Sequence, residues 1–266
     1  MKELNIIVCI KQVPDPEGPS SAFEVDSATK KVHPVGITPV INPFDQNALE
    51  AALQLRDNYG GNIVAISMLE GPATPVLKKA LSVGANQLIL LQDEHFRDLN
   101  CSSTAYVLSA AIRKLEPYDL ILVGRQAADW DFGQVGSIIA EILQVPCISL
   151  ATKVEIEDHK KVVVKKLRRN GYEVIKAPMP ALITVSSEIG DLRIPLLKDI
   201  KEAYKKPSTI WNISSLEIDS QRLETRKIYT LLPPPSKKRE CFIVGGDSPQ
   251  EKGEKLALQL RHDKVI

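Results

Sequence analysis

The chain has 266 residues and a formal net charge of +1; 44% of its residues are hydrophobic and 25% are charged. This composition is typical of a water-soluble protein with one large core, built as one domain or as one domain with an arm. It gives no electrostatic basis for binding nucleic acid or an anionic membrane, and no apolar run approaches the ~20 residues that span a bilayer. Widely spaced cysteines without a C-x-x-C pair, and an N-terminus without a signal-peptide cleavage site, predict reduced thiols in a cytoplasmic protein.

Apolar runs typical of buried strands alternate with helical patterns through the first half of the chain. This alternation predicts βαβ units, and therefore an α/β fold with a doubly wound, mostly parallel sheet. An extended proline-containing loop at 11–16 and a small hairpin at 23–33 follow the first strand. Strands are predicted at 4–10, 62–68, 87–91 and 120–123, helices at 42–59, 74–83, 101–115 and 134–143, and a turn at Gly71-Pro72.

Beyond residue 146 the pattern changes to that of an antiparallel extension of the same sheet. An exposed loop and helix follow up to about residue 200, then a polar segment to 230 and a stiff proline spacer at 233–235. Ser248 resembles a helix cap, and the helix that it begins is predicted to end near residue 260. The strands predicted in this half lie at 147–150, 153–157, 161–167, 172–176 and 181–185.

The most informative chemistry lies in the stretch 119–136, where a buried strand leads into a loop and the start of a helix. Gly124, Gly133 and Gly136 let the backbone approach a ligand closely, and the amino end of the helix favours a phosphate. Ligands of parallel sheets lie outside the carboxyl ends of the strands, so we expect the loops at 9–15, 68–71 and 124–136 to form one crevice. We predict that this crevice holds an adenine nucleotide, although the glycines alone would also suit a tight strand–helix turn.

Several side chains of this crevice allow more than one interpretation. Asp129 and Asp131 are either caps or solvated loop acids, or else ligands of ribose hydroxyls, because carboxylates repel phosphate. Arg125 either forms a surface salt bridge or holds a pyrophosphate or a flavin carbonyl. Asn42 either caps the helix that follows it or contacts the ligand, and Cys9 is interpreted as an apolar wall residue. The scattered histidines suggest neither a metal site nor a Ser-His-Asp arrangement, so no catalytic side chain is predicted.

Short motifs, specific in their order and spacing, lie at 11–15, 41–45, 48–52, 71–72, 81–85 and 124–136. In this order they resemble the beta subunit of electron transfer flavoproteins over essentially the whole chain. The resemblance implies an adenine nucleotide alpha-hydrolase-like fold and an alpha-subunit partner that carries an FAD. In this family the beta subunit binds AMP in the housekeeping type, or a second FAD, reduced by NADH, in the electron-bifurcating type. The motifs at 11–15 and 124–136 are closer to the bifurcating type.

The resemblance also implies which residues contact the cofactor and the partner. The segment around Leu197 resembles the family's recognition loop for a dehydrogenase, and Arg193, Pro195 and Leu197 match its Arg-x-Pro-x-Leu pattern. Leu197 is then the docking anchor; the alternative is an ordinary loop leucine packed on the core. The implied nucleotide contacts are Cys9, Asn42, Pro43, Phe44, Asp45, Met68, Gly124, Arg125, Gln126, Ala127, Asp129, Asp131, Gly133, Gln134 and Val135.

From this resemblance we expect a nucleotide- or flavin-binding α/β domain at 1–188, with the antiparallel extension included. A partner-recognition loop and connecting segment would follow at 189–232, and a C-terminal arm at 233–266 would pack on the alpha subunit. The complex would pass electrons between NADH or ferredoxin and a flavin-containing dehydrogenase by electron bifurcation. The alternatives are a housekeeping AMP-binding beta subunit and, in another class, a sensor like the universal stress proteins that carries no electrons.

Two departures from the family pattern are visible. Relatives of the bifurcating type keep small residues where this chain has Trp130 and Phe132. These rings either pack on a partner protein or stack on adenine or flavin. Leu69-Glu70 looks like an insertion, and Asp199 and Lys201 replace the usual glycine and methionine of the recognition loop. The dehydrogenase that is recognised therefore stays open.

Overall fold

The computed structural model describes residues 3–69, 75–232 and 241–266, which divide into two compact units, Met1–Leu231 and Leu232–Ile266. The predicted turn at Gly71-Pro72, Glu70 of the apparent insertion and the proline spacer at 233–235 lie outside the described residues. The second unit contains helix α7 (Pro249–His262). As predicted, Ser248 caps it, because the Ser248 side chain accepts a hydrogen bond of 3.2 Å from the Glu251 amide.

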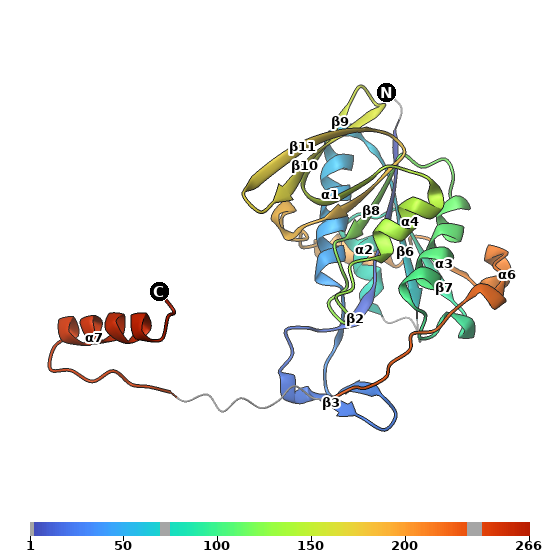
Figure 1. The fold of residues 1–266 in the computed structure, drawn as a ribbon. Helices are drawn as coiled ribbons and strands as arrows, with labels where there is room; N and C mark the ends of the chain where they lie inside the picture. Colours follow the sequence, from blue (N-terminus) through green and yellow to red (C-terminus); the bar gives the residue numbers. More distant parts are fainter. Residues whose placement is uncertain (1–2, 70–74, 233–240) are drawn as a thin grey trace. The chain divides into compact units, whose positions relative to one another are not determined.

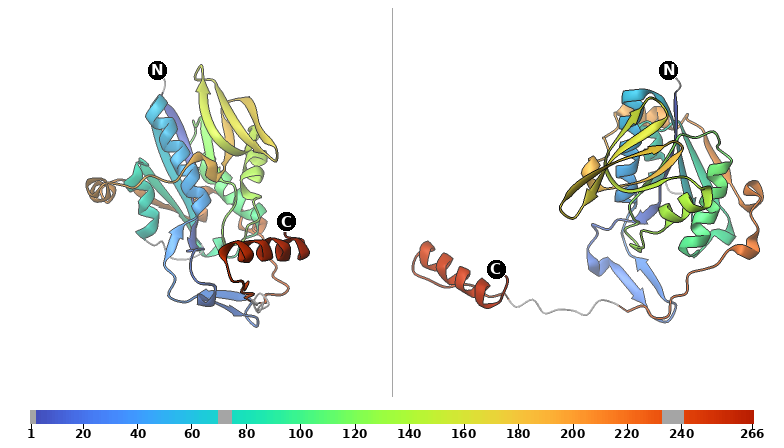
Figure 2. Two further views of the ribbon diagram at one scale, coloured as in Figure 1. Left: turned by 90° about the vertical axis from the view of Figure 1, so that its left-hand side faces the viewer. Right: turned by 45° about the horizontal axis from the view of Figure 1, so that its top comes forward.

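The first unit is organised around one sheet, in which the described residues form nine strands in the order β11-β10-β9-β12-β8-β1-β6-β7-β13. Neighbouring strands from β9 to β13 in this order run parallel, and β10 is antiparallel to both of its neighbours, β9 and β11. The predicted α/β class with its antiparallel extension is confirmed (Figures 1 and 2). The strands are β1 (Leu4–Cys9), β6 (Gly61–Leu69), β7 (Gln87–Gln92), β8 (Leu120–Gly124), β9 (Cys147–Glu157), β10 (Lys161–Arg168), β11 (Gly171–Pro178), β12 (Ala181–Val185) and β13 (Ser208–Trp211).

Helices cover both faces of the sheet because its central strands are apolar on both faces. In β1, Leu4, Ile6 and Val8 pack into a core with α1 (Pro43–Tyr59) and α2 (Lys79–Val83). Ile7 and Cys9, on the opposite face, pack with α3 (Cys101–Arg113) and α4 (Val135–Leu143). This alternation along one strand makes the sheet doubly wound, as Figure 1 shows for α1 and α3. Short helices follow at α5 (Leu197–Ala203) and α6 (Ile213–Leu216).

Some predicted elements differ from the structure. The predicted helix at 74–83 begins, within the described residues, as a 3-10 turn at Pro75–Lys78, and only α2 is α-helical. The loop predicted at 11–16 contains β2 (Gln12–Pro14), which pairs with β5 (Pro39–Ile41). The small hairpin is present as β3 (Phe23–Asp26) and β4 (Lys31–Pro34). The edge strand β13 was not predicted, because its four residues gain their hydrogen bonds only from β7, far away in the sequence.

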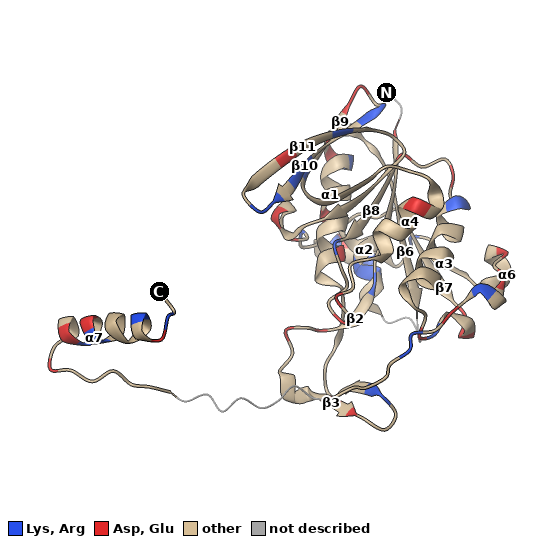
Figure 3. Cartoon of the chain, in the orientation of Figure 1, with Lys and Arg blue, Asp and Glu red and all other residues tan. Residues whose placement is uncertain are grey.

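Basic and acidic residues are interspersed along the elements of the first unit (Figure 3). Among the helices in the described parts of the chain, none combines the length and the apolar character needed to cross a membrane.

Lys206, just before β13, joins this edge strand to α2. Its ammonium group donates to the carbonyl oxygens of Leu81 and Ala85, each at 2.8 Å. Both carbonyls lie at the carboxyl end of α2, where a cation is favourable. Burial lowers the pKa of Lys206 below its usual range.

We predict that Lys206→Ala lowers the free energy of unfolding by about 1–3 kcal/mol, since it leaves two carbonyls without their charged donor. Urea unfolding measures this. The matched control is Lys205→Ala: its 2.7 Å ion pair with Glu202 is exposed, so its removal changes stability by less than about 0.5 kcal/mol. Equal losses in the two variants would show that Lys206 contributes no more than a surface charge.

Candidate nucleotide-binding site

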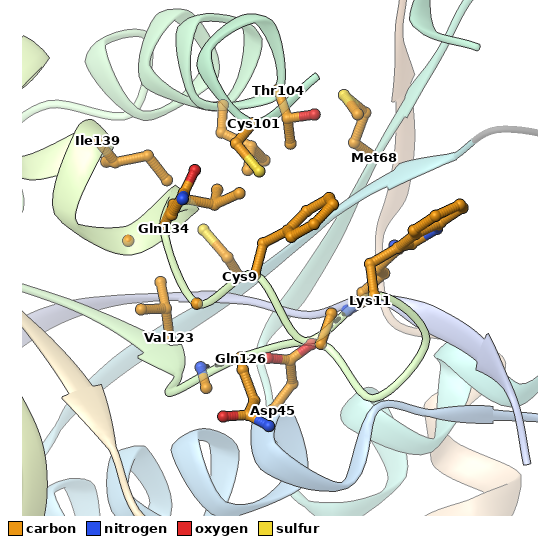
Figure 4. A pocket seen from close by; sticks show the side chains of 18 of the residues that line it. Cys9, Lys11, Asp45, Met68, Cys101, Thr104, Val123, Gln126, Gln134 and Ile139 are labelled. Carbon is orange, nitrogen blue, oxygen red and sulfur yellow. Dashed lines mark hydrogen bonds between the residues drawn. The ribbon is translucent and has the colours of Figure 1, made fainter. Parts of the chain in front are cut away.

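A pocket opens at the carboxyl ends of β1 and β8, next to the amino end of α4 (Figure 4). Its empty space is ≈ 980 Å³ when the solvent in its open mouth is included. Ten of the predicted contacts are among its lining residues: Cys9, Asp45, Met68, Gly124, Arg125, Gln126, Ala127, Gly133, Gln134 and Val135.

The start of α1 holds the floor of this pocket together. The buried Asp45 carboxylate accepts hydrogen bonds from the Lys11 amide (2.7 Å) and the Gly124 amide (3.1 Å). These amides follow β1 and end β8, so one side chain ties both strand ends to the helix. Burial raises the pKa of Asp45 to about 7, against the effect of these amide bonds.

Asn42 lies fully buried beside Asp45, and its side chain does not cap α1. Its amide group donates to the Gln126 carbonyl oxygen (2.8 Å) and accepts from the Ala128 amide (3.1 Å). Asn42 therefore occupies the cap position of α1, as one interpretation expected, but through its backbone and not its side chain. Neither Asn42, Pro43 nor Phe44 lines the pocket. The Asn42 side chain shapes the loop that follows β8.

Close packing explains two glycines of this loop, and backbone geometry explains the third. A Cβ atom on Gly124 would lie 2.6 Å from the Phe44 carbonyl carbon, because the start of α1 crosses β8 there. A Cβ atom on Gly136 would lie 2.7 Å from a Val123 methyl carbon, so glycine lets α4 pack close to the end of β8. Gly133 has φ +62°, the left-handed region that favours glycine.

The amino end of α4 provides unbonded donors at the pocket wall. The first amides of a helix have no acceptor within the helix, and here Gln134 at the cap position makes no side-chain bond to them. The first turn of α4 holds no acidic residue, and Gln134, Val135 and Gly136 all line the pocket. This arrangement suits an anion such as a phosphate.

Arg125 is a cation of the pocket wall that has a hydrogen-bond donor without a partner. Its guanidinium lies over the Phe44 ring, 4.5 Å from the centroid. Its Nε atom is buried and has no hydrogen-bond partner, and none of the described carboxylates forms an ion pair with it. Among the described residues Arg125 therefore forms no close ion pair, so the salt-bridge interpretation gains no support. A buried N–H without a partner is costly, so an acceptor from a ligand would be stabilising here.

The two loop aspartates bond to their own chain rather than line the pocket. Asp129 forms a 2.6 Å ion pair with Lys11, and Asp131 accepts a 2.7 Å hydrogen bond from Gln126. In this geometry both carboxylates fix the loop, which does not favour the predicted ribose contacts.

Cys9 forms part of the apolar side of the pocket. Burial, together with the nearby Asp45 carboxylate, raises the pKa of its thiol to about 12. The thiol stays neutral at physiological pH, as its interpretation as a wall residue requires. No cluster of potential metal ligands occurs among the residues that the structure describes.

The pocket contains residues that were not predicted as contacts. Lys11 lies in a motif quoted above, whereas Trp130 and Phe132 were noted as departures that either pack on a partner protein or stack on adenine or flavin. Nothing in the sequence around Arg226 or Leu99 indicates a pocket residue, because both lie outside the motifs and only the fold brings them to the pocket. The other lining residues outside the implied contacts are Ile10 and Gly136, which lie in the loops expected to form the crevice, and Cys101, Thr104, Leu108, Val123 and Ile139.

The predicted docking segment is held by a row of polar side chains on α1. Glu50 accepts three hydrogen bonds from Arg193: from its amide (3.1 Å), its Nε atom (3.0 Å) and its terminal nitrogen (2.9 Å). The other terminal nitrogen donates to Asp57 at 2.6 Å. Asn47, on the same side of the helix, donates to the Gly190 carbonyl at 2.8 Å. The Arg193 guanidinium is therefore engaged within the chain, whereas Leu197 is 70% exposed.

Comparison with known proteins places these features in a family context. A family model described as the electron transfer flavoprotein domain matches residues 31–216. Subunit CarD of the caffeyl-CoA reductase-Etf complex of Acetobacterium woodii is 34% identical, covering 99% of this chain and all of the relative. An electron transfer flavoprotein subunit beta of Thermoanaerobacterium thermosaccharolyticum is 39% identical over 90% of this chain and 92% of its own length. Protein FixA of Azotobacter vinelandii is 32% identical over 96% of this chain and 93% of its own length.

Asp45 predicts a pH dependence of stability. Its pKa is about 7 in the folded chain and 3.8 for the ordinary carboxyl, so the folded chain keeps a proton that the unfolded chain releases. The contribution of Asp45 to the free energy of unfolding therefore falls as pH rises from about 4 to 7 and is constant above. Urea unfolding of wild type and Asp45→Asn should show their stability difference falling over this window. A difference that rises instead would mean that the two amides hold the carboxylate charged.

Arg193 predicts the order of the segment that it anchors. Arg193→Met should raise amide hydrogen exchange at 189–197 by about tenfold or more, because each charge-assisted hydrogen bond contributes about 1.5–3 kcal/mol. Exchange read by mass spectrometry checks this. The control is Lys198→Met, at an exposed neighbouring position, which should leave exchange unchanged. If exchange is also unchanged in Arg193→Met, the bonds from Arg193 to Glu50 and Asp57, here called the Arg193 clamp, contribute nothing to local order.

Proposed function

The chain belongs to the electron transfer flavoprotein family, among its beta subunits, and from this membership we propose that its pocket binds FAD. The observation that carries the proposal is the buried, unpartnered Nε atom of Arg125 in a wall shared with the amino end of α4. A phosphate-bearing ligand supplies the acceptor that both features lack.

The lining residues divide by chemistry in a way that fits such a ligand. Arg125 and the first amides of α4 would hold phosphate oxygens. Cys9, Val123 and Ile139 give an apolar surface against which a ring can lie. Gly124 and Gly136 keep Cβ atoms out of places that the backbone of α1 and the end of β8 already occupy. When bound, a flavin supplies the redox chemistry; the protein supplies binding, orientation and electrostatics.

FAD is favoured over AMP by the motifs at 11–15 and 124–136, which are closer to the electron-bifurcating type. Together with an alpha subunit that holds a second FAD, the chain would pass electrons between NADH or ferredoxin and a flavin-containing dehydrogenase. The relative from Acetobacterium woodii is named as a subunit of a caffeyl-CoA reductase-Etf complex, which supports a dehydrogenase partner. The housekeeping, AMP-binding function is the alternative.

The division of labour along the chain follows from this proposal. Residues 1–188 bind the nucleotide, and 189–232 contain the docking segment and its connection. The arm at 233–266 packs on the alpha subunit. The exposure of α7 supports this: no residue of the helix is buried, and Leu258 is 67% exposed. Ile194, Leu196 and Leu197 form an exposed apolar group beside the Arg193 clamp and are the surface offered to the dehydrogenase.

The flavin count tests the nucleotide proposal. The chain is coexpressed with the alpha subunit, purified, and its released nucleotides are separated by chromatography. Two FAD molecules per heterodimer are expected. One FAD with one AMP would establish the housekeeping alternative. Retention of ATP by a stable homodimer, with no flavin and no alpha-subunit binding, would support the sensor class.

Leu197→Ala tests the docking surface. Truncating an apolar anchor at the centre of an interface costs on the order of 1–2 kcal/mol, so we expect about tenfold slower electron transfer to the dehydrogenase with unchanged flavin content. The rate is followed by flavin absorbance in stopped flow. Val174→Ala is the control for loss of an exposed apolar side chain on another element: Val174 is 66% exposed and lies on β11. Equal rates for wild type and Leu197→Ala would remove the anchor role.

A further inference from the structure

Trp130 and Phe132 form a stacked pair of rings in the pocket wall. Their centroids are 6.0 Å apart and their planes differ by 24°. Both residues line the pocket, and Phe132 is 52% exposed. Offset stacking at this distance is a favourable aromatic geometry, and a half-exposed ring at a pocket wall has surface left for a further ring.

The loop around these rings is fixed on both sides. Asp131 has φ 53° and Gly133 has φ 62°, so Phe132 stands between two residues in the left-handed region. The Asp131 amide donates to the Ala127 carbonyl at 2.8 Å, and the Asp131 and Asp129 side chains are bonded to Gln126 and Lys11 as described above. A loop held at this many points presents Phe132 in one direction, at little further cost in conformational entropy on binding.

A distant segment of the chain supports Trp130 from outside the loop. The Arg226 guanidinium lies 4.4 Å from the centroid of the Trp130 ring and pairs with Asp98 at 3.0 Å. The backbone there is fixed as well: the Arg226 amide donates to the Asp98 carbonyl at 2.7 Å, and the Asn100 amide donates to the Glu224 carbonyl at 2.9 Å. Trp130 thus contacts both an anchored cation and Phe132, and the cation–π contact helps to hold the Trp130 ring in place.

We propose that Phe132, supported by Trp130 and Arg226, is a stacking platform for a planar ring of the bound nucleotide. The proposal rests on the nucleotide-binding function above and adds a determinant of ligand preference: a compound with an aromatic ring gains over one with phosphate alone. Adenine and isoalloxazine share the chemistry that the platform selects, a flat π system. Because phenylalanine has no polar group, position 132 contributes a ring surface to the pocket and no side-chain hydrogen bond.

The first test compares two substitutions of one ring in the full chain. Isothermal titration with FAD and with AMP gives dissociation constants for wild type, Phe132→Leu and Phe132→Tyr. Leucine keeps the apolar bulk and removes the π face, so affinity should fall about tenfold, whereas tyrosine should bind within about twofold of wild type. Tyr172→Leu, an exposed ring on β11, is the control and should change nothing.

The second test measures the fluorescence emission of Trp130 and leaves both rings of the stack unchanged. The chain has two tryptophans, so Trp211→Phe leaves Trp130 as the single reporter. Saturating AMP or FAD should change Trp130 emission in this variant. AMP is the informative ligand, because adenine does not accept energy from tryptophan and acts only through contact. A change in Trp130 emission on addition of AMP indicates that adenine stacks on the platform. If Phe132→Leu loses affinity for FAD but not for AMP in the titrations, the stacking ring is isoalloxazine.

The outcomes separate this proposal from the one on which it rests. If wild type binds neither nucleotide, the nucleotide-binding function fails. If wild type binds but Phe132→Leu binds equally well, the platform alone is overturned. It is also overturned if Phe132→Leu keeps its nucleotide affinity and instead weakens association with the alpha subunit, because the rings are then a protein contact.

Discussion

The site depends on one buried carboxylate. Asp45 accepts hydrogen bonds from the Lys11 and Gly124 amides, and so joins the ends of two adjacent parallel strands to the start of α1. Burying this carboxyl is costly, as its raised pKa shows, and the two amide bonds offset only part of that cost. In return, the Asp45 carboxylate fixes the ends of β1 and β8 relative to the start of α1. The loops after β1 and β8 both line the pocket, and each is bonded to the Asp45 side chain where it leaves its strand.

Helix α1 also connects the pocket with the docking segment. Its first turn holds the loop after β8 through Asn42 and Asp45, and its later turns hold residues 190–193 through Asn47, Glu50 and Asp57. Spacings of three and seven residues put the last three side chains on one side of the helix. A single helix packed on the central strands therefore fixes both places, so the apolar group beside Arg193 has a defined position relative to the pocket.

The extent of prediction from sequence follows from the range of the interactions involved. The central strands could be predicted because their apolar runs lie within a few residues, and α4 because its amphipathic pattern follows a glycine loop. The edge strand β13 could not, since its partner β7 lies over a hundred residues earlier. For the same reason the sequence left two interpretations open for Asn42 and for Arg125, and it did not predict that the Arg193 guanidinium bonds Glu50. Residue type indicated that these positions matter, but only the fold shows what each side chain contacts.

The motif at 124–136 therefore mixes two kinds of residue that a position-by-position comparison treats alike. Gly124, Asp129 and Asp131 act on the chain itself, by admitting α1 or by fixing the loop. Arg125, Gln134 and Val135 face the pocket, where a ligand meets them. Substitution of the first kind changes the wall, whereas substitution of the second kind changes what the wall binds. Trp130 and Phe132 belong to the second kind, since the bonds that fix the loop come from their neighbours. The framework of the family can thus be kept while the surface offered to the ligand changes.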